Sequence, residues 1–389
     1  MTFHIRTLNA ISHAGLSRLP KDAFQTGSDV ENPDAIMLRS ANLHGVAIPD
    51  SLLAVARAGA GTNNIPIAEY SAKGIPVFNT PGANANAVKE LVLAALFLAA
   101  RNIVPAAAFA HRLDGDAAGM DKAVEAGKKN FVGFELPGRT LGVIGLGAIG
   151  VEVANAATGL GMRVLGYDPG ITVEHAWKLS SFVEHVTNLD QLLKRADIIT
   201  VHVPLIDATR GLIGAEQLAK MHRSSVVINF ARGPIVDEAA VIDALESNQL
   251  RAYICDFPSP ALNKRDKVVT LPHLGASTAE AEENCAVMAA DQLRDYLTEG
   301  TILNSVNFPN AALARAAGTS RIAIANSNVP NMVGQISTLL AGAGLNIADL
   351  LNKSRGELAY TLVDVEGTIG ADLVAEIRAI PGVLSARLL

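Results

Sequence analysis

The sequence has little cysteine, few aromatic residues and no long hydrophobic run. Its two cysteines among 389 residues, Cys255 and Cys285, form neither a CxxC pair nor a metal-binding spacing, so we expect a reduced protein without a metal site. The most apolar run, residues 91–100, falls well short of the ~20 residues needed to span a bilayer. The N-terminal segment MTFHIRTLNAISHAGL lacks the apolar core of a signal peptide. These absences predict a cytoplasmic protein with no membrane partner.

A strong charge of either sign is also absent. The formal net charge is −6, from 32 Lys and Arg against 38 Asp and Glu, and this balance does not favour a nucleic-acid partner. An anionic small molecule is not excluded, since it needs only a local arginine or backbone N–H groups. Hydrophobic residues make up 49% and charged residues 18%, so we expect a globular chain of two or three domains.

Short β-like runs alternate with helical runs along the first 300 residues. After residue 139 the β-like runs are continuously apolar, which is typical of parallel strands buried on both faces. The predicted strands are 3–8, 35–39, 52–57, 76–79, 141–144, 163–167, 197–203, 225–230, 252–256 and 267–271. We predict an α/β protein, with a Rossmann-type doubly wound parallel sheet in residues 94–278. A smaller, flavodoxin-like α/β domain is expected to combine residues 1–93 and 279–308.

The remaining segments complete this organisation. A helix over 279–299 is predicted to pack back on the first domain, and the apolar run 91–100 to form a helix buried between domains. Residues 309–320 are rich in alanine and glycine and indicate a linker. Residues 321–389 then alternate as strand, helix, strand, strand, helix, strand. This βαββαβ order predicts a separate ferredoxin-like domain.

A glycine-rich turn, GLGAIG, follows the predicted strand 141–144. It contains Gly145, Gly147 and Gly150, opens a helical segment, and precedes a second strand after which Asp168 stands. This context favours a dinucleotide-binding turn over a tight strand–helix turn without a ligand. The glycines would permit the turn, the approach of a pyrophosphate and close packing of the helix. Asp168 would accept hydrogen bonds from ribose hydroxyls and repel a 2′-phosphate, so NAD is predicted rather than NADP.

Three polar residues stand at or just after the ends of later predicted strands: Arg232, Asp256 and His273. The carboxyl ends of such strands face the ligand crevice of a doubly wound sheet. Oxidation of a hydroxy acid needs a cation for the carboxylate and a base for the hydroxyl proton, and Arg232 and His273 are groups of those two kinds. The alternatives are a structural histidine and an arginine in a surface ion pair.

Several segments together resemble the D-isomer-specific 2-hydroxyacid dehydrogenase family. They are AGAGTNN (58–64), GIPVFNTPG (74–82), VKELVL (88–93), GLGAIG (145–150), VHVPL (201–205), NFARGPIVD (229–237) and LPHLGAST (271–278). The resemblance extends across nearly the whole of the first 300 residues. The appended tail and the details GYDP and AST are most similar to family members that oxidise a phosphorylated 2-hydroxy acid.

The resemblance implies an NAD-dependent oxidoreductase that acts on a phosphorylated 2-hydroxy acid. Arg232 would clamp the substrate carboxylate and His273 would be the acid/base. The part formed by 1–93 and 279–308 would bind substrate through Arg39, Ser40 and Asn63. The implied cofactor contacts are Gly145, Gly147, Ala148, Ile149, Gly150, Asp168, His202, Val203, Pro204, Phe230, Ala231, Asp256, Gly275 and Ala276, with Asp256 on the nicotinamide side. Pairing of cofactor domains in the family implies a homodimer or homotetramer.

One segment departs from the family pattern. The family usually places a glutamate shortly after the aspartate equivalent to Asp256, where it hydrogen-bonds the catalytic histidine. Here residues 258–263 are PSPALN, and no carboxylate lies between Asp256 and Asp266. We predict retained activity with a lower pH midpoint than in a glutamate-paired enzyme. Two alternatives stay open: a glycerate- or lactate-type dehydrogenase, and a non-catalytic NAD-sensing regulatory protein on the same fold.

The tail resembles an ACT domain, a small regulatory module that binds amino acids at paired domain interfaces. NVPNMVGQIS (328–337) and LNIADLLNKSRGELAYTLVDV (345–365) carry this resemblance. It implies a serine effector, with Asn328 and Asn346 at matching positions, and Asn331 stands where the family usually has glycine. The alternative is a module for dimerisation alone.

Overall fold

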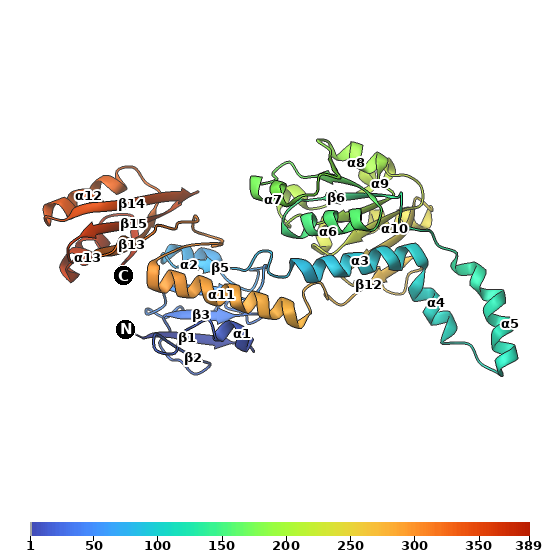
Figure 1. The fold of residues 1–389 in the computed structure, drawn as a ribbon, viewed down its shortest axis with the longest axis horizontal. Helices are drawn as coiled ribbons and strands as arrows, with labels where there is room; N and C mark the ends of the chain where they lie inside the picture. Colours follow the sequence, from blue (N-terminus) through green and yellow to red (C-terminus); the bar gives the residue numbers. More distant parts are fainter. Residues whose placement is uncertain (1) are drawn as a thin grey trace. The chain divides into compact units, whose positions relative to one another are not determined.

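The computed structural model describes residues 2–389, which form two compact units. The first unit comprises the residues up to Asn84 together with Ala279–Leu389, and the second comprises Ala85–Thr278. Figure 1 traces the elements of each along the chain. The domain boundary predicted at 93/94 falls inside a continuous helix, α3 (Ala85–Arg101), and this whole helix belongs to the second unit.

A five-stranded parallel sheet forms the centre of the first unit. Its order, β2-β1-β3-β4-β5, is the flavodoxin-like arrangement that was predicted. The strands are β1 Phe3–Leu8, β2 Phe24–Gly27, β3 Ala35–Leu38, β4 Ala54–Arg57 and β5 Val77–Phe78. The helices are α1 His13–Leu16, α2 Ile67–Ala72 and α11 Ala279–Glu299.

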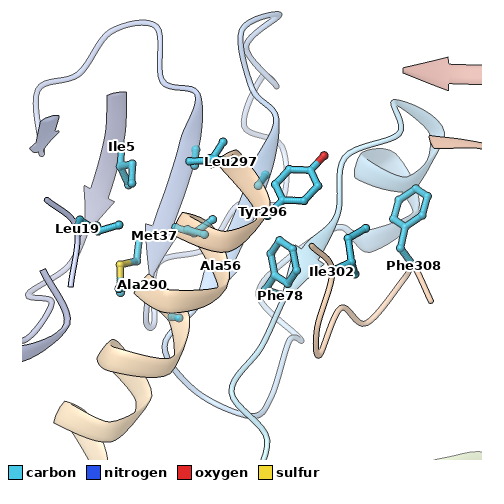
Figure 2. Packing of buried hydrophobic residues seen from close by; sticks show 14 of the residues in the cluster. Ile5, Leu19, Met37, Ala56, Phe78, Ala290, Tyr296, Leu297, Ile302 and Phe308 are labelled. Atoms are coloured by element: carbon cyan, nitrogen blue, oxygen red, sulfur yellow. The ribbon is translucent and has the colours of Figure 1, made fainter. Parts of the chain in front are cut away.

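Helix α11 packs its buried face against this sheet, as predicted for the 279–299 segment. Figure 2 shows Ile5, Met37 and Ala56 of the strands in one apolar cluster with Ala290 and Leu297 of the helix. All five side chains are fully buried. The helix therefore belongs to the core of the first unit although more than 190 residues separate it from β5.

A seven-stranded parallel sheet forms the centre of the second unit. Its order is β12-β11-β10-β9-β6-β7-β8, so the direction of winding reverses beside β6, as in the predicted Rossmann arrangement. The strands are β6 Thr140–Ile144, β7 Arg163–Tyr167, β8 Val183–His185, β9 Ile198–Val201, β10 Ser225–Asn229, β11 Leu250–Cys255 and β12 Val268–Thr270. Every residue of β6, β9 and β10 is buried, which explains their continuous apolar runs.

Helices surround this sheet. They are α3 Ala85–Arg101, α6 Ala148–Gly159, α7 Val173–Lys178, α8 Leu189–Arg195, α9 Ala215–Lys220 and α10 Glu238–Glu246, with the 3-10 turns η2 Asp207–Thr209 and η3 Gly233–Ile235. Val92 and Leu96 of α3 share a buried cluster with Val151 and Ala154 of α6. The apolar run 91–100, for which we predicted a place between domains, thus packs inside the second unit.

Two helices after α3 form an arm that the sequence reasoning did not predict. They are α4 Ile103–Ala110 and α5 Ala117–Gly127, followed by the 3-10 turn η1 Lys128–Phe131. Figure 1 shows them projecting from the rest of the second unit. All eight residues of α4, IVPAAAFA, are apolar, and none is buried. Among residues 2–389 no single helix has the length and hydropathy of a membrane span, although α3 and α4, bent by 66°, pass that test jointly.

The tail forms a four-stranded antiparallel sheet with two helices. Its elements are β13 Thr319–Ser327, α12 Met332–Gly342, β14 Asn346–Arg355, β15 Leu358–Glu366, α13 Ala371–Arg378 and β16 Val383–Leu388. The strand order β14-β15-β13-β16 confirms the ferredoxin-like topology. An apolar cluster that includes Ile324, Ile336, Val363 and Ile377 joins the sheet to both helices.

The opposite face of this sheet packs against the end of α11. Tyr360 and Leu362 of β15 share an apolar cluster with Tyr296 and Leu297 of α11. Side chains of the tail also donate to carbonyl groups in the last turn of this helix and to that of Gly300, which follows the helix. The pairs are Arg387 to Tyr296 and Leu297, Arg321 to Glu299 (3.1 Å), and Tyr360 to Gly300 (2.8 Å). The tail therefore caps α11.

An ion pair is enclosed in the same face. Arg321 of β13 lies directly opposite Asp364 of β15, and both side chains are 0% exposed. Nε and Nη2 of Arg321 donate to the two oxygens of Asp364 at 2.6 and 2.7 Å. This bidentate geometry raises the pKa of the Arg321 guanidinium, chiefly through the hydrogen bonds to Asp364. The sequence reasoning did not identify this pair.

Candidate active site

The predicted cofactor and catalytic residues follow the carboxyl ends of strands in the seven-stranded sheet. Gly145 follows β6, Asp168 follows β7, His202 follows β9, Arg232 follows β10, Asp256 follows β11 and His273 follows β12. Because all these strands are parallel, their carboxyl ends lie along one edge of the sheet. The structure therefore brings the residues of this unit to the same edge.

The glycine turn after β6 leaves no room for side chains at two of its positions. Gly145 has a φ of +92°, and its N–H donates to the carbonyl oxygen of Tyr167 at 2.8 Å. A Cβ on Gly145 would lie 2.8 Å from the carbonyl carbon of His202, and one on Gly150 would lie 1.9 Å from the carbonyl oxygen of Gly145. Beside Gly147 there is open space. The turn therefore has the close packing and the open side that a bound pyrophosphate requires.

The start of α6 adds hydrogen-bond donors to this turn. Gly147 is the N-cap residue and provides no side chain, so the N–H groups of Ala148 and Ile149 have no partner within the helix. Such N–H groups and the helix dipole favour a phosphate. Asp168 accepts from the N–H of Leu146 with one oxygen and from that of Gly170 with the other, both at 2.8 Å. This carboxylate thus fastens the glycine turn to the end of β7.

His202 packs against the glycine turn. Its N–H donates to the carbonyl oxygen of Ile144 at 2.7 Å, and its Nε2 lies 2.9 Å from the hydroxyl of Thr200. Burial lowers the pKa of the imidazole to about 4, so the ring is neutral at pH 7. The following residues, Val203 and Pro204, continue the loop at the same strand end. Val203 approaches the position of a Cβ on Gly145 to 2.9 Å.

Acid should destabilise the second unit through His202. Its pKa falls on folding from 6.5 to about 4, so the unfolded chain binds more protons between those pH values and stability decreases as the pH falls through that interval. We expect His202→Gln to flatten the dependence of the thermal unfolding midpoint on pH over this range. His185→Gln, which changes an exposed histidine of the same unit, is the matched control. Equal pH dependence in both variants and the parent protein would contradict the prediction.

A buried amide organises the loop that carries Arg232. Asn229 is 0% exposed; it donates to the carbonyl oxygen of Arg232 at 2.9 Å and accepts from the N–H of Ala231 at 3.1 Å. The Arg232 side chain is exposed, and its Nη1 donates to the carbonyl oxygen of Ala231 at 2.7 Å. Phe230 is buried in the apolar cluster of the sheet. Sequence reasoning did not select Asn229, whose signal is a polar residue at the end of an otherwise apolar strand.

Asp256 holds the loop that carries His273. It is 1% exposed, and its two oxygens accept from the N–H groups of Leu274 and Gly275, each at 2.7 Å. Its observed partners are therefore backbone groups of the His273 loop, where we predicted a nicotinamide contact. His273 has a φ of +58°, a conformation that costs a non-glycine residue about 1–3 kcal/mol. The two bonds to Asp256 offset this strain. Ala276 follows in the same loop, partly exposed.

The His273 side chain is exposed, and its ring partner is aromatic. The rings of Phe257 and His273 lie edge to face, with centroids 5.5 Å apart and an interplanar angle of 70°. Within residues 85–278 no carboxylate forms a hydrogen bond or ion pair with the imidazole. Ser259, one polar residue of the divergent loop, accepts from the N–H of Leu262 at 3.1 Å and caps its own turn. The loop thus provides no substitute carboxylate inside this unit.

The predicted substrate residues of the first unit lie at the carboxyl edge of the five-stranded sheet. Arg39 follows β3, and its Nη2 lies 2.7 Å from a carboxylate oxygen of Glu282 in α11. The side-chain oxygen of Asn9 accepts from the N–H of Arg39 at 3.4 Å and of Ser40 at 3.0 Å. Asn63 is exposed after β4. Asn9, which sequence reasoning missed, has a φ of +70° and shapes the Arg39 loop.

Arg57 is a second arginine at this edge, and sequence reasoning did not select it. Its Nε donates to the carbonyl oxygen of Arg39 at 2.9 Å, and its Nη1 donates to that of Gly61. It ends β4, the neighbour of β3 in the sheet. Arg57 therefore ties two strand ends together and places a second positive charge beside Arg39.

Known proteins resemble this chain in sequence over most of its length. The model of the D-isomer specific 2-hydroxyacid dehydrogenase NAD binding domain matches residues 94–275. D-3-phosphoglycerate dehydrogenase of Haemophilus influenzae is 34% identical over 349 residues, which cover 87% of this chain and 81% of that protein. The enzyme of the same name from Escherichia coli K12 is 34% identical over 353 residues, with coverage of 87% and 82%.

Solved structures of two dehydrogenases share the fold. An NAD⁺-bound 3-phosphoglycerate dehydrogenase of Entamoeba histolytica is 26% identical, with a TM-score of 0.61, over 79% of this chain and 99% of that one. The holo form of Rhodotorula graminis D-mandelate dehydrogenase, 23% identical, has a TM-score of 0.69 over 80% and 99%. The chain therefore belongs to the D-isomer-specific 2-hydroxyacid dehydrogenase family, and its second unit contains that family's NAD-binding domain.

Proposed function

We propose that the protein is a D-3-phosphoglycerate dehydrogenase, which oxidises 3-phospho-D-glycerate to 3-phosphooxypyruvate in the first step of L-serine synthesis. The observation that carries the proposal is the anchoring of two reactive residues at one sheet edge: Asn229 holds the Arg232 loop and Asp256 holds the His273 loop. The identity of 34% with D-3-phosphoglycerate dehydrogenases over 87% of the chain supports the substrate.

Each residue has a distinct role in this reaction. Arg232 binds the substrate carboxylate through its guanidinium and polarises the neighbouring C–O bond. His273 takes the proton of the C2 hydroxyl as general base. Bound NAD accepts the hydride that leaves C2. The glycine turn at Gly145 and the start of α6 hold its pyrophosphate, and Asp168 accepts from its ribose hydroxyls.

The first unit supplies the remaining substrate contacts in this proposal. Arg39, Ser40 and Asn63 meet the substrate, and the charge of Arg39 suits its phosphate group. Arg57, bonded to the backbone of Arg39, adds a second positive charge at the same strand ends. Glu282 neutralises part of this charge in the present structure, so phosphate would compete with Glu282 for Arg39.

Turnover with three acids tests the assignment. NADH formation should be fastest with 3-phospho-D-glycerate, and kcat/KM should be at least about 100-fold lower with D-glycerate, since D-glycerate lacks the phosphate group that Arg39 would bind in this proposal. D-Lactate serves as a second unphosphorylated substrate. Equal rates with phosphorylated and unphosphorylated acids would remove the phosphate assignment and favour a glycerate- or lactate-type dehydrogenase.

An NAD-sensing regulatory protein is the second candidate function. The aromatic partner of His273, in place of a carboxylate, favours it. Binding of NAD without NADH formation from any of the three acids would select this alternative. The anchored Arg232 and His273 loops support the enzyme, because a sensor has no need of two strained or clamped reactive residues.

We also propose that the tail is an ACT domain that binds serine between two copies of the chain. Asn328 donates to the carbonyl oxygen of Gly356 at one end of the sheet, whereas Asn346 donates to Glu366 at the other. The ten residues of β14 separate these ends by roughly 30 Å, so one copy cannot bring both asparagines to one serine. Initial rates measured with rising serine test the effector, and a flat response to millimolar concentrations would leave dimerisation as the role.

The arm supports the proposal of a homodimer or homotetramer. Ile103 and Val104 of the wholly apolar helix α4 are each 44% exposed, and Val132 beyond the arm is 73% exposed. A second copy offers the same apolar patch, and two-fold symmetry makes such a patch complementary to itself. Val104→Lys should therefore lower the mass measured by light scattering, while Val173→Lys, at a position 74% exposed outside the arm, should not.

A further inference from the structure

His273 has a fixed backbone but a ring that no polar group of its unit orients. Asp256 holds the loop through the N–H groups of Leu274 and Gly275. These bonds fix the position of the Cα of His273 and leave rotation about its side-chain bonds free. A general base must present one ring nitrogen to the reacting hydroxyl, so free rotation would reduce the fraction of productive encounters.

Phe257 is the side chain placed to restrict that rotation. Its ring meets the imidazole edge to face, at 5.5 Å between centroids and 70° between planes. The side chain also lies beside the Arg232 loop, since a Cβ on Gly233 would be 3.4 Å from the Cβ of Phe257. Phe257 follows the buried residues Cys255 and Asp256 and packs on the apolar cluster behind the sheet. The Phe257 side chain therefore meets the His273 ring and lies next to the Arg232 loop.

We propose that Phe257 is the positioning residue of His273, taking the orienting role for which the family resemblance implies a carboxylate. The inference rests on the proposed dehydrogenase function. An aromatic ring sets the plane of the imidazole through its quadrupole and its shape, and it accepts no hydrogen bond in that plane. Both ring nitrogens then remain available, one for the substrate hydroxyl and one for solvent.

The aromatic partner predicts a kinetic signature different from that of a carboxylate. Phe257 carries no charge, so its removal should disturb the orientation of His273 without changing the relative stability of imidazole and imidazolium through a lost ion pair. Turnover should therefore decrease while the pH midpoint of kcat/KM stays in place. Removal of a carboxylate partner would instead move that midpoint, because the imidazolium would lose its counter-charge.

Two substitutions at one position separate orientation from packing. Phe257→Leu keeps an apolar side chain over Gly233 but removes the ring, and Phe257→Tyr keeps the ring. With 3-phospho-D-glycerate and NAD we expect Phe257→Leu to lower kcat about tenfold with both KM values little changed, and Phe257→Tyr to retain most of the activity. Phe182→Leu, at an exposed phenylalanine of the same unit, is the control. Unchanged kcat in Phe257→Leu, equal losses in both Phe257 variants, or a midpoint displaced by a full pH unit would overturn the proposal.

A second measurement does not depend on turnover. In protein labelled at histidine, the ring signals of His273 are assigned by their loss in His273→Asn. Phe257→Leu should displace these signals, because the ring current of Phe257 acts on the imidazole, and Phe182→Leu should leave them in place. Unmoved signals in Phe257→Leu would refute the contact even if the wild-type protein oxidises no hydroxy acid. Displaced signals in an inactive wild-type protein would contradict the proposed function and not the contact.

Discussion

Replacement of His273 by asparagine should lower kcat for oxidation of 3-phospho-D-glycerate by about 10²–10⁴-fold, the range that a general base contributes. Asparagine keeps a polar side chain and tolerates the positive φ of +58° at this position better than most residues. The hydrogen bonds from Leu274 and Gly275 to Asp256 come from the backbone of the next two residues, so they should survive the substitution. The loss should thus fall on proton transfer.

Cofactor affinity separates this effect from a general disturbance of the site. The Kd for NADH, followed by protein fluorescence quenching, should change little in His273→Asn, because the glycine turn lies at the end of a different strand, β6. His185→Asn, which alters an exposed histidine at the end of β8, is the matched control for turnover. A kcat within about threefold of the wild-type value would exclude His273 as the base.

Replacement of Asp364 by asparagine should destabilise the first unit by about 3–5 kcal/mol, the usual cost of leaving one member of a buried ion pair without its partner. Arg321 is 0% exposed, donates to both oxygens of Asp364 and also caps the carbonyl of Glu299. Asparagine removes the negative charge and offers one acceptor where two are needed. Urea unfolding followed by circular dichroism measures the shift of the transition.

The double replacement Arg321→Met and Asp364→Leu is the informative comparison. Apolar residues of similar size often replace a buried pair at little cost, so this double variant should be much closer to the wild-type protein than Asp364→Asn is. A surface pair, Lys178 with Glu174, provides the contrast, since the Glu174→Gln change should leave the unfolding transition nearly unchanged. An Asp364→Asn variant as stable as Glu174→Gln would contradict the prediction.

The strands of the two parallel sheets could be predicted where burial on both faces left continuous apolar runs. The run DIITVHV contains β9 and SVVINF contains β10, and all residues of these strands are buried. Two edge strands were missed for the opposite reason. β2 (FQTG) and β8 (VEH) are short and partly exposed, and their polar residues interrupt the continuous apolar run by which the other strands were predicted. Helix α4 was missed because an apolar helix with no buried face has no amphipathic period.

The sequence allowed us to predict which residues of the candidate site stand at strand ends. It did not allow us to predict the hydrogen bonds and ring contacts that join them. Gly145, Asp168, Arg232 and His273 follow from motifs whose chemistry is local. The partners of Asp256 are 18 and 19 residues away along the chain, and only the folded loop shows that its oxygens serve the backbone beside His273. The same is true of Phe257, whose contact with the imidazole depends on the relative placement of two strand ends.

The contacts between the tail and the end of α11 determine whether the tail can be removed or exchanged between proteins. Appended domains are commonly exchanged at linkers, because few contacts cross the boundary. Here removal of the tail at residues 309–320 would uncover Tyr296 and Leu297 and leave the carbonyl groups of Leu297 and Gly300 without their donors, Arg387 and Tyr360. The tail therefore cannot be exchanged for another domain without disturbing α11. A chimeric protein that receives the tail should therefore also receive α11, and one that receives α11 should also receive the tail.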